Sequence, residues 1–186
     1  MNTTTETLYT PLTIDTAPEA SKPVLQKIRI NNGFIPNLMA IFANNPAVLQ
    51  GYAALDSAFE AGSFRPRKRQ LILLAASVEN NCNYCTAAHS MILKGMLRTP
   101  DEIVSAVRNN KTIPDAKFDA LVVLVKELVR ERGYARERTI QNFIAAGYRK
   151  EQVMELLLGI ALKTISNYLD HISPAPLDQA FAAEGK

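Results

Sequence analysis

Two cysteines and a histidine stand close together near the middle of the chain. The segment reads Cys82-Asn83-Tyr84-Cys85, and His89 follows Cys85 by four residues. On a helix, residues three, four or seven positions apart lie on one face, so these three functional side chains can meet. Two thiols at this separation can close a disulfide reversibly, and an imidazole can take a thiol proton because its pKa lies near neutrality. The spacing therefore predicts a dithiol–disulfide redox centre.

The residues before Cys82 favour a helix that begins at this cysteine. Asn80 and Asn81 tolerate left-handed backbone geometry and compete for backbone hydrogen bonds, so they predict a break between two helices. A thiol in the first turn lies beside unpaired N–H groups at the positive end of the helix dipole, and both stabilise a thiolate. A lone cysteine or histidine is more often a packing or surface residue, but the three together favour redox chemistry.

Zinc binding is the main alternative use of the same side chains. Cys82, Cys85 and His89 could supply three ligands, and His171, the only other histidine, could supply a fourth. Structural zinc ligands commonly come from turns on separate elements, so three ligands from one helix are less favoured. We expect a metal-free centre without a bound cofactor, with a non-catalytic helical module that binds zinc or a protein partner as the alternative.

The composition is that of an ordinary globular protein. Of the 186 residues, 47% are hydrophobic and 21% are charged, and the net charge of +3 is scattered rather than gathered in a basic stripe. Nucleic-acid binding is therefore not expected. No apolar run reaches the roughly 20 residues that cross a membrane, and the N-terminus does not have the pattern of a secretory signal. We expect a cytoplasmic protein, in which a close cysteine pair is more often catalytic or metal-binding than structural.

Hydrophobic residues recur every three or four positions along nearly the whole chain, which predicts an all-α fold. Prolines suited to first turns and glycines suited to helix ends mark the boundaries. No linker divides the chain after the polar N-terminus, so we expect an extended arm at 1–17 and a single helical domain at 18–186. The expected helices span 18–31, 46–61, 66–80, 82–97, 100–109, 114–132, 136–146 and 149–172, with a short last turn near 177–184.

At these residues the sequence resembles the alkylhydroperoxidase-like (AhpD-like), or carboxymuconolactone decarboxylase, superfamily. The resemblance is carried by the pattern Asn81-Cys82-x-Tyr84-Cys85-x-x-Ala88-His89, and it extends to the segments 33–38, 163–168 and 176–181. It implies an AhpD-like helical bundle, a homo-oligomer, and a peroxidase or disulfide reductase that needs neither metal nor haem.

The resemblance also implies a role for each residue of the motif. Cys85 would be the thiolate that attacks a hydroperoxide and becomes a sulfenic acid, and Cys82 would resolve it as a disulfide. An external dithiol, of the thioredoxin or lipoyl type, would reopen the disulfide. His89 would act in proton transfer.

Position 70 departs from the pattern of the superfamily. Its peroxidase members usually carry a glutamate twelve residues before the first cysteine, as the far end of a proton relay, and this chain has Gln70. An amide can orient an imidazole but cannot accept its proton at neutral pH. Glu79, three residues before Cys82, is a candidate for the missing carboxylate, with an exposed helix-end glutamate as the alternative.

The name of the superfamily suggests a second reaction, the decarboxylation of a lactone. That reaction needs an acid–base pair at the substrate rather than two thiols. The presence of both Cys82 and Cys85 therefore favours thiol chemistry.

Overall fold

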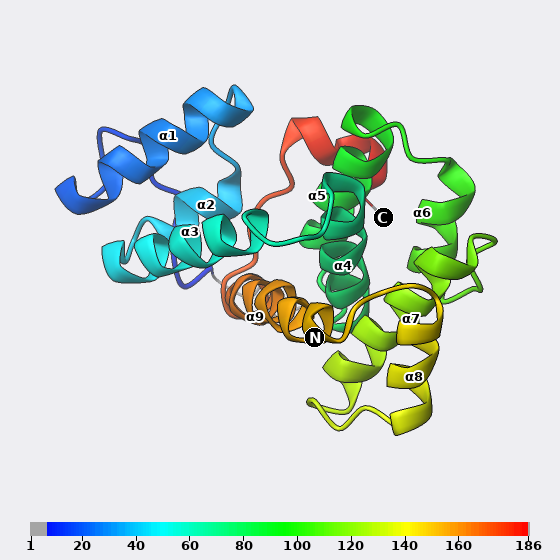
Figure 1. Cartoon of the computed structure of the whole chain (residues 1–186). Helices are drawn as coiled ribbons and strands as arrows, with labels where there is room; N and C mark the ends of the chain where they lie inside the picture. The colour runs from blue at the N-terminus through cyan, green and yellow to red at the C-terminus, as the bar shows by residue number, and fades with distance from the viewer. Residues whose placement is uncertain (1–6, 186) are drawn as a thin grey trace, which may run out of the picture.

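The fold is built around helix α4 (Pro66–Glu79), whose apolar residues do not keep to one face. Residues 71–77 are all buried, and a helix that is apolar on every side must be enclosed by other elements. In the computed structural model, which describes residues 7–185, α4 packs against α5 (Asn83–Met91), α6 (Asp101–Arg108), α7 (Ala116–Arg130) and α9 (Lys150–Ile172). Every regular element in this range is a helix, which confirms the all-α prediction (Figure 1).

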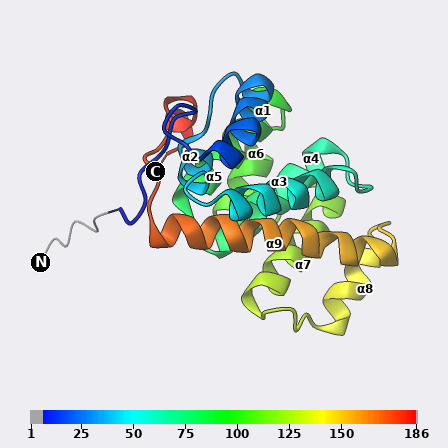
Figure 2. The ribbon, with the colours of Figure 1, turned by 90° about the vertical axis from the view of Figure 1, so that its left-hand side faces the viewer.

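The remaining helices flank this centre on two sides. Helices α1 (Lys22–Asn32), α2 (Asn37–Phe42) and α3 (Pro46–Glu60) lie on one side, and α6, α7 and α8 (Glu137–Ala145) lie on the other (Figure 1). Helix α9 crosses the molecule between α7 and α8 on one side and the N-terminal helices on the other, and it contacts both groups (Figure 2). Within the described range, no helix has both the length and the apolar character needed to cross a membrane.

Buried side chains form two hydrophobic clusters, and the cysteines belong to the smaller one. The larger cluster joins α4 with α6, α7, α8 and α9. The smaller one joins α1, α2 and α3 with α5 and the short C-terminal helix η3 (Gln179–Glu184), and it contains Cys82 and Cys85. The two cysteines are thus held between the N-terminal helices and the C-terminal segment.

The predicted helices are confirmed within a few residues, with two differences. Helix α2 was missed, because six residues after Pro36 are too short to show a helical period. The helix expected at 82–97 is continued beyond Met91 by a π-helical turn, Ile92–Met96. The last turn expected near 177–184 is η3.

The described part of the N-terminal arm, residues 7–17, contains no helix and lies against the domain. The backbone N–H of Leu12 donates to the carbonyl of Ala40 at 3.1 Å, and that of Tyr9 donates to Ser173 Oγ at 2.9 Å. The rest of the predicted arm, residues 1–6, lies outside the described residues.

Candidate active site

The cysteine pair lies where the sequence places it, at the start of α5. Asn81 has a left-handed backbone with φ of 58°, and it separates the end of α4 from Cys82, the N-cap residue of α5. The sulfur of Cys82 accepts a hydrogen bond from the backbone N–H of Cys85 at 3.3 Å. Both cysteines are free thiols and both are buried. The predicted helix break and helix start are confirmed.

Cys85 forms part of the wall of a cavity of about 250 Å³ between α5, the N-terminal helices and η3. Its side chain is otherwise enclosed, with 3% of the residue exposed. His89 and Lys163 contribute polar groups to the same cavity, while Cys82 does not line it. The rest of the wall is mainly aromatic or apolar: Phe34, Pro36, Leu38, Met39, Tyr52, Tyr84, Ala88, Met91, Ile92, Met96 and Phe181.

Lys163 of α9 is the polar group that the sequence interpretation missed. It is only 2% exposed, and its Nζ lies 2.9 Å from His89 Nε2. Burial is the largest single effect and would lower the pKa of Lys163, but the charges of Cys85, Tyr52 and Cys82 together outweigh it, so the pKa is raised. The lysine is therefore a buried cation that faces the thiolate of Cys85.

The surroundings of the two sulfurs push their pKa values in opposite directions. A hydrogen bond from Cys82 and the charge of Lys163 outweigh the effect of burial and lower the pKa of Cys85 to about 6. The amide of Asn167 acts in the same direction. The hydrogen bond to Cys85, together with burial, raises the pKa of Cys82. At neutral pH the pair therefore consists of a Cys85 thiolate and a Cys82 thiol.

His89 is held from both sides of its ring. Its Nδ1 lies 2.8 Å from Gln70 Oε1, and its Nε2 lies 2.9 Å from the ammonium of Lys163. Because an ammonium can only donate, Nε2 accepts, and Nδ1–H donates to Gln70. Burial, and then the charge of Lys163, lower the pKa of His89 well below its usual value. His89 is thus a neutral imidazole, which reaches the cysteine through Lys163.

Gln70 therefore lies where the sequence interpretation placed it, against His89, whereas Glu79 does not join the site. The carboxylate of Glu79 lies 3.5 Å from the guanidinium of Arg130 of α7. The suggestion that Glu79 supplies the missing relay carboxylate is therefore not supported by its position. Asn81 interrupts the helix between Glu79 and Cys82, so the two residues do not share a helix face, although α4 and α5 pack against each other.

The four ligands of the alternative zinc site are not gathered around one point. His171 is exposed near the end of α9, where its ring stacks on Tyr168 with 6.3 Å between ring centroids. Both nitrogens of His89 have partners. Across residues 7–185, no group of three or more His, Cys, Asp and Glu side chains is arranged to hold a metal ion.

Three polar side chains of α9 face the cysteine pair from the interior. Lys163, Asn167 and Asp170 are spaced by four and three residues, so they share one face of the helix, and all three are buried. Asp170 Oδ2 accepts a hydrogen bond from the thiol of Cys82 at 3.3 Å. The sequence could have indicated these residues, because polar side chains that recur on the buried face of an apolar helix are unusual and point to a functional role.

The end of the chain completes the cavity wall through η3. The hydroxyl of Tyr84 donates to Asp178, whose carboxylate also accepts the backbone N–H of Asn37. The ring of Phe181 packs edge-on against Tyr84 with centroids 5.8 Å apart. The wall beside Cys85 is therefore fixed by contacts between α5, α2 and the C-terminal segment.

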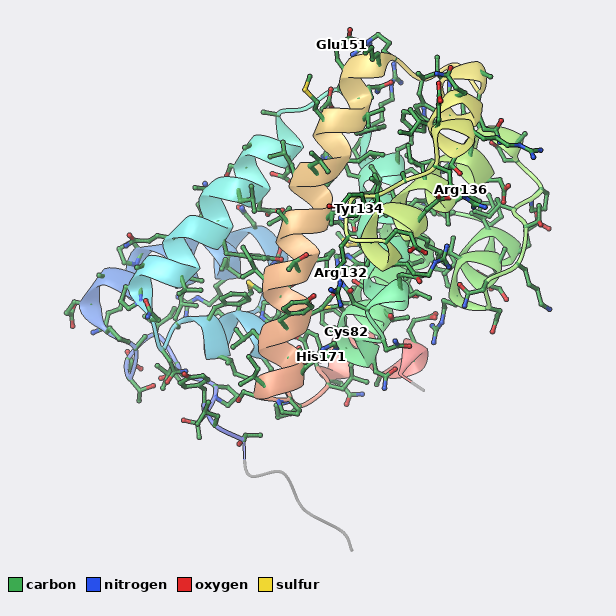
Figure 3. The ribbon with its side chains drawn as sticks, turned by 90° about the horizontal axis from the view of Figure 1, so that it is seen from below. Cys82, Arg132, Tyr134, Arg136, Glu151 and His171 are labelled. Atoms are coloured by element: carbon green, nitrogen blue, oxygen red, sulfur yellow. The ribbon has the colours of Figure 1, made fainter. Side chains whose placement is uncertain are left out.

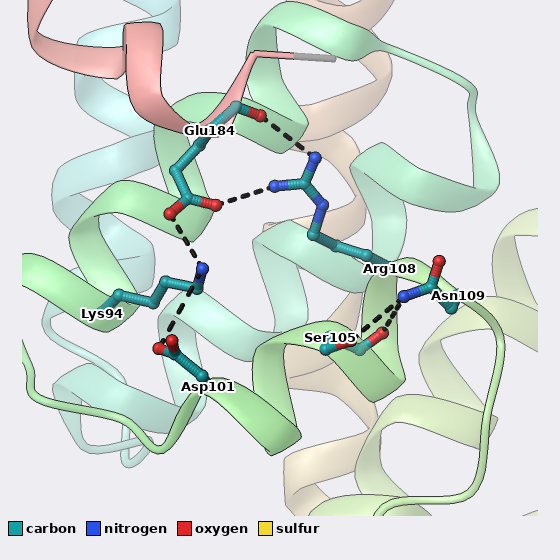
Figure 4. Close-up of polar contacts among 6 residues, drawn as sticks. All are labelled: Lys94, Asp101, Ser105, Arg108, Asn109 and Glu184. Atoms are coloured by element: carbon teal, nitrogen blue, oxygen red, sulfur yellow. Dashed lines mark hydrogen bonds and ion pairs between the residues drawn. The ribbon is translucent and has the colours of Figure 1, made fainter.

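Glu184 anchors the far end of η3 to the opposite helices. Its carboxylate pairs with Lys94 at 2.9 Å and with Arg108 at 2.9 Å, and Arg108 also donates to its backbone carbonyl (Figure 4). These contacts keep the helix that carries Phe181 over the cavity.

Comparison with known proteins finds one matching family over part of the chain. Residues 46–126, which include the cysteine motif, match the sequence profile of the carboxymuconolactone decarboxylase family. No sequence among curated proteins matches the chain significantly.

Several solved structures share the fold along nearly the whole chain. A peroxidase-related protein from Ralstonia eutropha JMP134 with an alkylhydroperoxidase AhpD core is 20% identical, with a TM-score of 0.83 and 94% of each chain covered. A peroxidase-related protein from Silicibacter sp. TM1040 is 16% identical, with a TM-score of 0.79 and 97% of each chain covered. The debrominase Bmp8 in complex with 2,3,4-tribromopyrrole is 20% identical, with a TM-score of 0.79 and 96% of each chain covered. The chain therefore has the fold of these AhpD-like proteins, and its residues 46–126 are similar to the carboxymuconolactone decarboxylase family.

Proposed function

We propose that this protein is a thiol-dependent peroxidase, which reduces hydroperoxides by cycling Cys82 and Cys85 between a dithiol and a disulfide. The observation that carries the proposal is the contrast between the two sulfurs. Cys85 lies on the wall of a cavity as a thiolate, with a pKa of about 6, beside a buried ammonium. Cys82, the thiol next to it, is kept away from that cavity. This is the arrangement that an attacking thiolate and a resolving thiol require.

The reaction balances with these groups alone and one external reductant. The Cys85 thiolate attacks the terminal oxygen of the hydroperoxide, the O–O bond breaks, and the alkoxide leaves after taking a proton. Cys85 is then a sulfenic acid. Cys82 attacks that sulfur, an S–S bond forms, and water leaves. A dithiol of the thioredoxin or lipoyl class reduces the disulfide and becomes a disulfide itself.

Lys163 is the group placed to supply the proton for the leaving alkoxide. Its ammonium lies between the Cys85 thiolate and His89 Nε2, and it lines the cavity. His89 Nε2 accepts a hydrogen bond from this ammonium, and Gln70 orients the imidazole through Nδ1. In this proposal the amide at position 70 is sufficient, because it fixes the imidazole without having to accept a proton.

The cavity favours organic hydroperoxides over hydrogen peroxide. Most of its wall is apolar or aromatic, and its polar residues are Asn31 and Asn32 besides Cys85, His89 and Lys163. A small organic hydroperoxide can place its peroxide group beside Cys85 and its carbon skeleton against Phe34 and Phe181.

Variants of the two cysteines test the proposal. The parent protein should consume cumene hydroperoxide in the presence of a dithiol, Cys85→Ser should lose the activity, and Cys82→Ser should react once and then stop. Equal consumption by all three proteins would refute the peroxidase assignment.

We also propose that the protein is a homo-oligomer that uses the outer face of α9. Figure 3 shows α9 uncovered on this side of the molecule. Exposed apolar residues recur along it every three to eight positions and form one stripe: Met154, Leu157, Ile165, Tyr168 and Ile172. We expect α9 of a second copy of the chain to pack on this stripe, because a regular apolar stripe suits packing between helices. Light scattering on the parent and on Leu157→Glu tests this, with a monomeric parent as the contradicting result.

Reductive dehalogenation is a second candidate for the same site. The debrominase Bmp8 shares the fold and was solved with a flat brominated pyrrole, and the cavity beside Cys85 has aromatic walls that suit a flat ring. Such a reaction would replace a C–Br bond by C–H, release bromide, and leave the two thiols as a disulfide. Bromide release from 2,3,4-tribromopyrrole, compared with hydroperoxide consumption under the same conditions, separates the two functions.

A further inference from the structure

Asp170 is a buried carboxylate that none of the proposed steps of the peroxidase cycle uses. It lies on the last turns of α9 and is 8% exposed. One oxygen, Oδ1, accepts the backbone N–H of Ala175 at 3.0 Å, which fixes the side chain. The other, Oδ2, lies 3.3 Å from Cys82 Sγ, the sulfur that must become a nucleophile in the second half of the cycle. An anchoring role for the C-terminal segment uses only Oδ1 and leaves Oδ2 unexplained.

A second cavity, of about 500 Å³, opens on this side of the redox pair. Asp170 and His171 line it together with the helix break at Asn81 and the segment that follows α9. It shares only Tyr84 with the substrate cavity, and Cys85 does not reach it. Figure 3 shows Cys82 and His171 close together in projection at the C-terminal end of α9. Asp170 thus stands between the buried thiol and a route to water that is separate from the substrate's.

We propose that Asp170 is the catalytic base of the resolving cysteine: it takes the proton of Cys82 as the disulfide forms and passes it to water through the second cavity. The inference rests on the proposed dithiol cycle. Two residues of α9 then act on the two cysteines in different ways: Lys163 stabilises the thiolate of Cys85, and Asp170 removes the proton of Cys82.

The single S–H proton of Cys82 has two acceptors, and the oxidation state of Cys85 decides between them. In the reduced protein the thiolate of Cys85 attracts this proton, which lowers the pKa of Cys85. Once Cys85 is a sulfenic acid it no longer carries a negative charge, and Asp170 Oδ2 at 3.3 Å is the remaining acceptor. Cys82 then loses its proton to Asp170, its sulfur attacks Cys85, and hydroxide leaves and is protonated to water.

Replacement by asparagine removes the base while preserving the anchor. In Asp170→Asn, the amide oxygen still accepts from Ala175, and the amide nitrogen faces Cys82, where it cannot take a proton. Asp119→Asn is the matched control, because Asp119 also accepts a backbone N–H, that of Ile113 at 2.8 Å, far from the cysteines. Circular dichroism and thermal melting first establish that both variants are folded.

The test is a single pulse of cumene hydroperoxide, followed by trapping of sulfenic acid with dimedone and mass spectrometry. In Asp170→Asn the loss of the Cys85 thiolate should be as fast as in the parent, or faster, because the carboxylate raises the pKa of Cys85. Disulfide formation should be roughly a hundredfold slower, with dimedone adduct accumulating. Disulfide formation at the parental rate without adduct would overturn the proposal.

A measurement on the unaltered protein keeps the proposal testable if Asp170→Asn does not fold. The groups that act on Cys82 are Asp170 and Cys85, with Lys163 beside them. With an ionised carboxylate as base, the rate of disulfide formation should be nearly constant between about pH 6 and pH 8. A rate that rises about tenfold per pH unit would mean that Cys82 ionises without help, and would overturn the proposal.

Diamide separates this inference from the peroxidase assignment. Cys85 adds to its N=N bond, and Cys82 then displaces the hydrazine product, so the second step again requires the proton of Cys82 to leave. If the parent forms a disulfide with diamide but not with hydroperoxide, the peroxidase assignment fails while Asp170 is still tested. A defect of Asp170→Asn with diamide would support its role, and parental behaviour would refute it.

Discussion

Replacement of Lys163 by methionine tests the electrostatic basis of the site. Methionine fills a similar volume but removes the cation that lies 2.9 Å from His89 Nε2 and faces the Cys85 thiolate. Loss of a neighbouring opposite charge shifts a pKa by about 1–3 units. From a starting pKa of about 6, a rise of about two units lowers the thiolate fraction at pH 7 from roughly 0.9 to roughly 0.1.

The expected loss of reactivity is therefore about tenfold for alkylation of Cys85 by iodoacetamide at pH 7. Reaction with hydroperoxide should fall further, because the alkoxide also loses its proton donor, which is worth roughly 10²–10⁴-fold. Raising the pH to about 9 should restore alkylation but not the hydroperoxide reaction. Lys126→Met is the control, since Lys126 is equally a buried lysine but bonds to Val107 and Asn110. A Cys85 pKa that stays near 6 in Lys163→Met would refute the reasoning.

Four further outcomes follow from the site and its supports. In the parent, alkylation of Cys85 should rise with pH to half its maximum near pH 6 and be nearly constant above pH 7, because the thiolate is the reactive form; a midpoint near 8.5 would contradict this. Glu79→Gln should oxidise at the parental rate in stopped-flow assays and lose at most about 1 kcal/mol of stability, whereas slowed oxidation would return Glu79 to the relay. Gln70→Glu should raise the pKa of His89 in an NMR titration, because a carboxylate at Nδ1 favours the imidazolium; an unchanged or lower value would show that the two side chains are not in contact. Gly159→Ala should destabilise the fold by about 1–3 kcal/mol in denaturant melts, because the added Cβ would lie 2.8 Å from its nearest side-chain atom, and an unchanged midpoint would refute the close packing of α9.

The sequence was sufficient for those parts of the site that depend on local spacing. Asn81 does break the helix, Cys82 does begin the next one, and Gln70 does meet His89 across adjacent helices. Each of these features follows from residues less than two dozen positions apart. The helices themselves were predictable for the same reason, except for α2, which is too short to show a period.

The parts that were missed depend on the packing of α9 against α5. Lys163 and Asp170 lie about 80 residues further along the chain than the cysteines that they approach. Hydrophobic periodicity predicts single helices, but it does not predict which distant helices pack together. Glu79 was the opposite case, since it is near Cys82 in sequence but turned toward α7. Proximity along the chain did not predict which residues contact the cysteines across the helix break. The buried polar residues of α9 would have predicted them better.

Thiol counting after exposure to one equivalent of an organic hydroperoxide tests the central claim most directly. The reduced chain has two free thiols. We predict that both disappear together, that the mass of the chain falls by two hydrogens, and that one equivalent of alcohol is produced. Retention of both thiols, or loss of one with a lasting gain of oxygen, would contradict a dithiol–disulfide cycle.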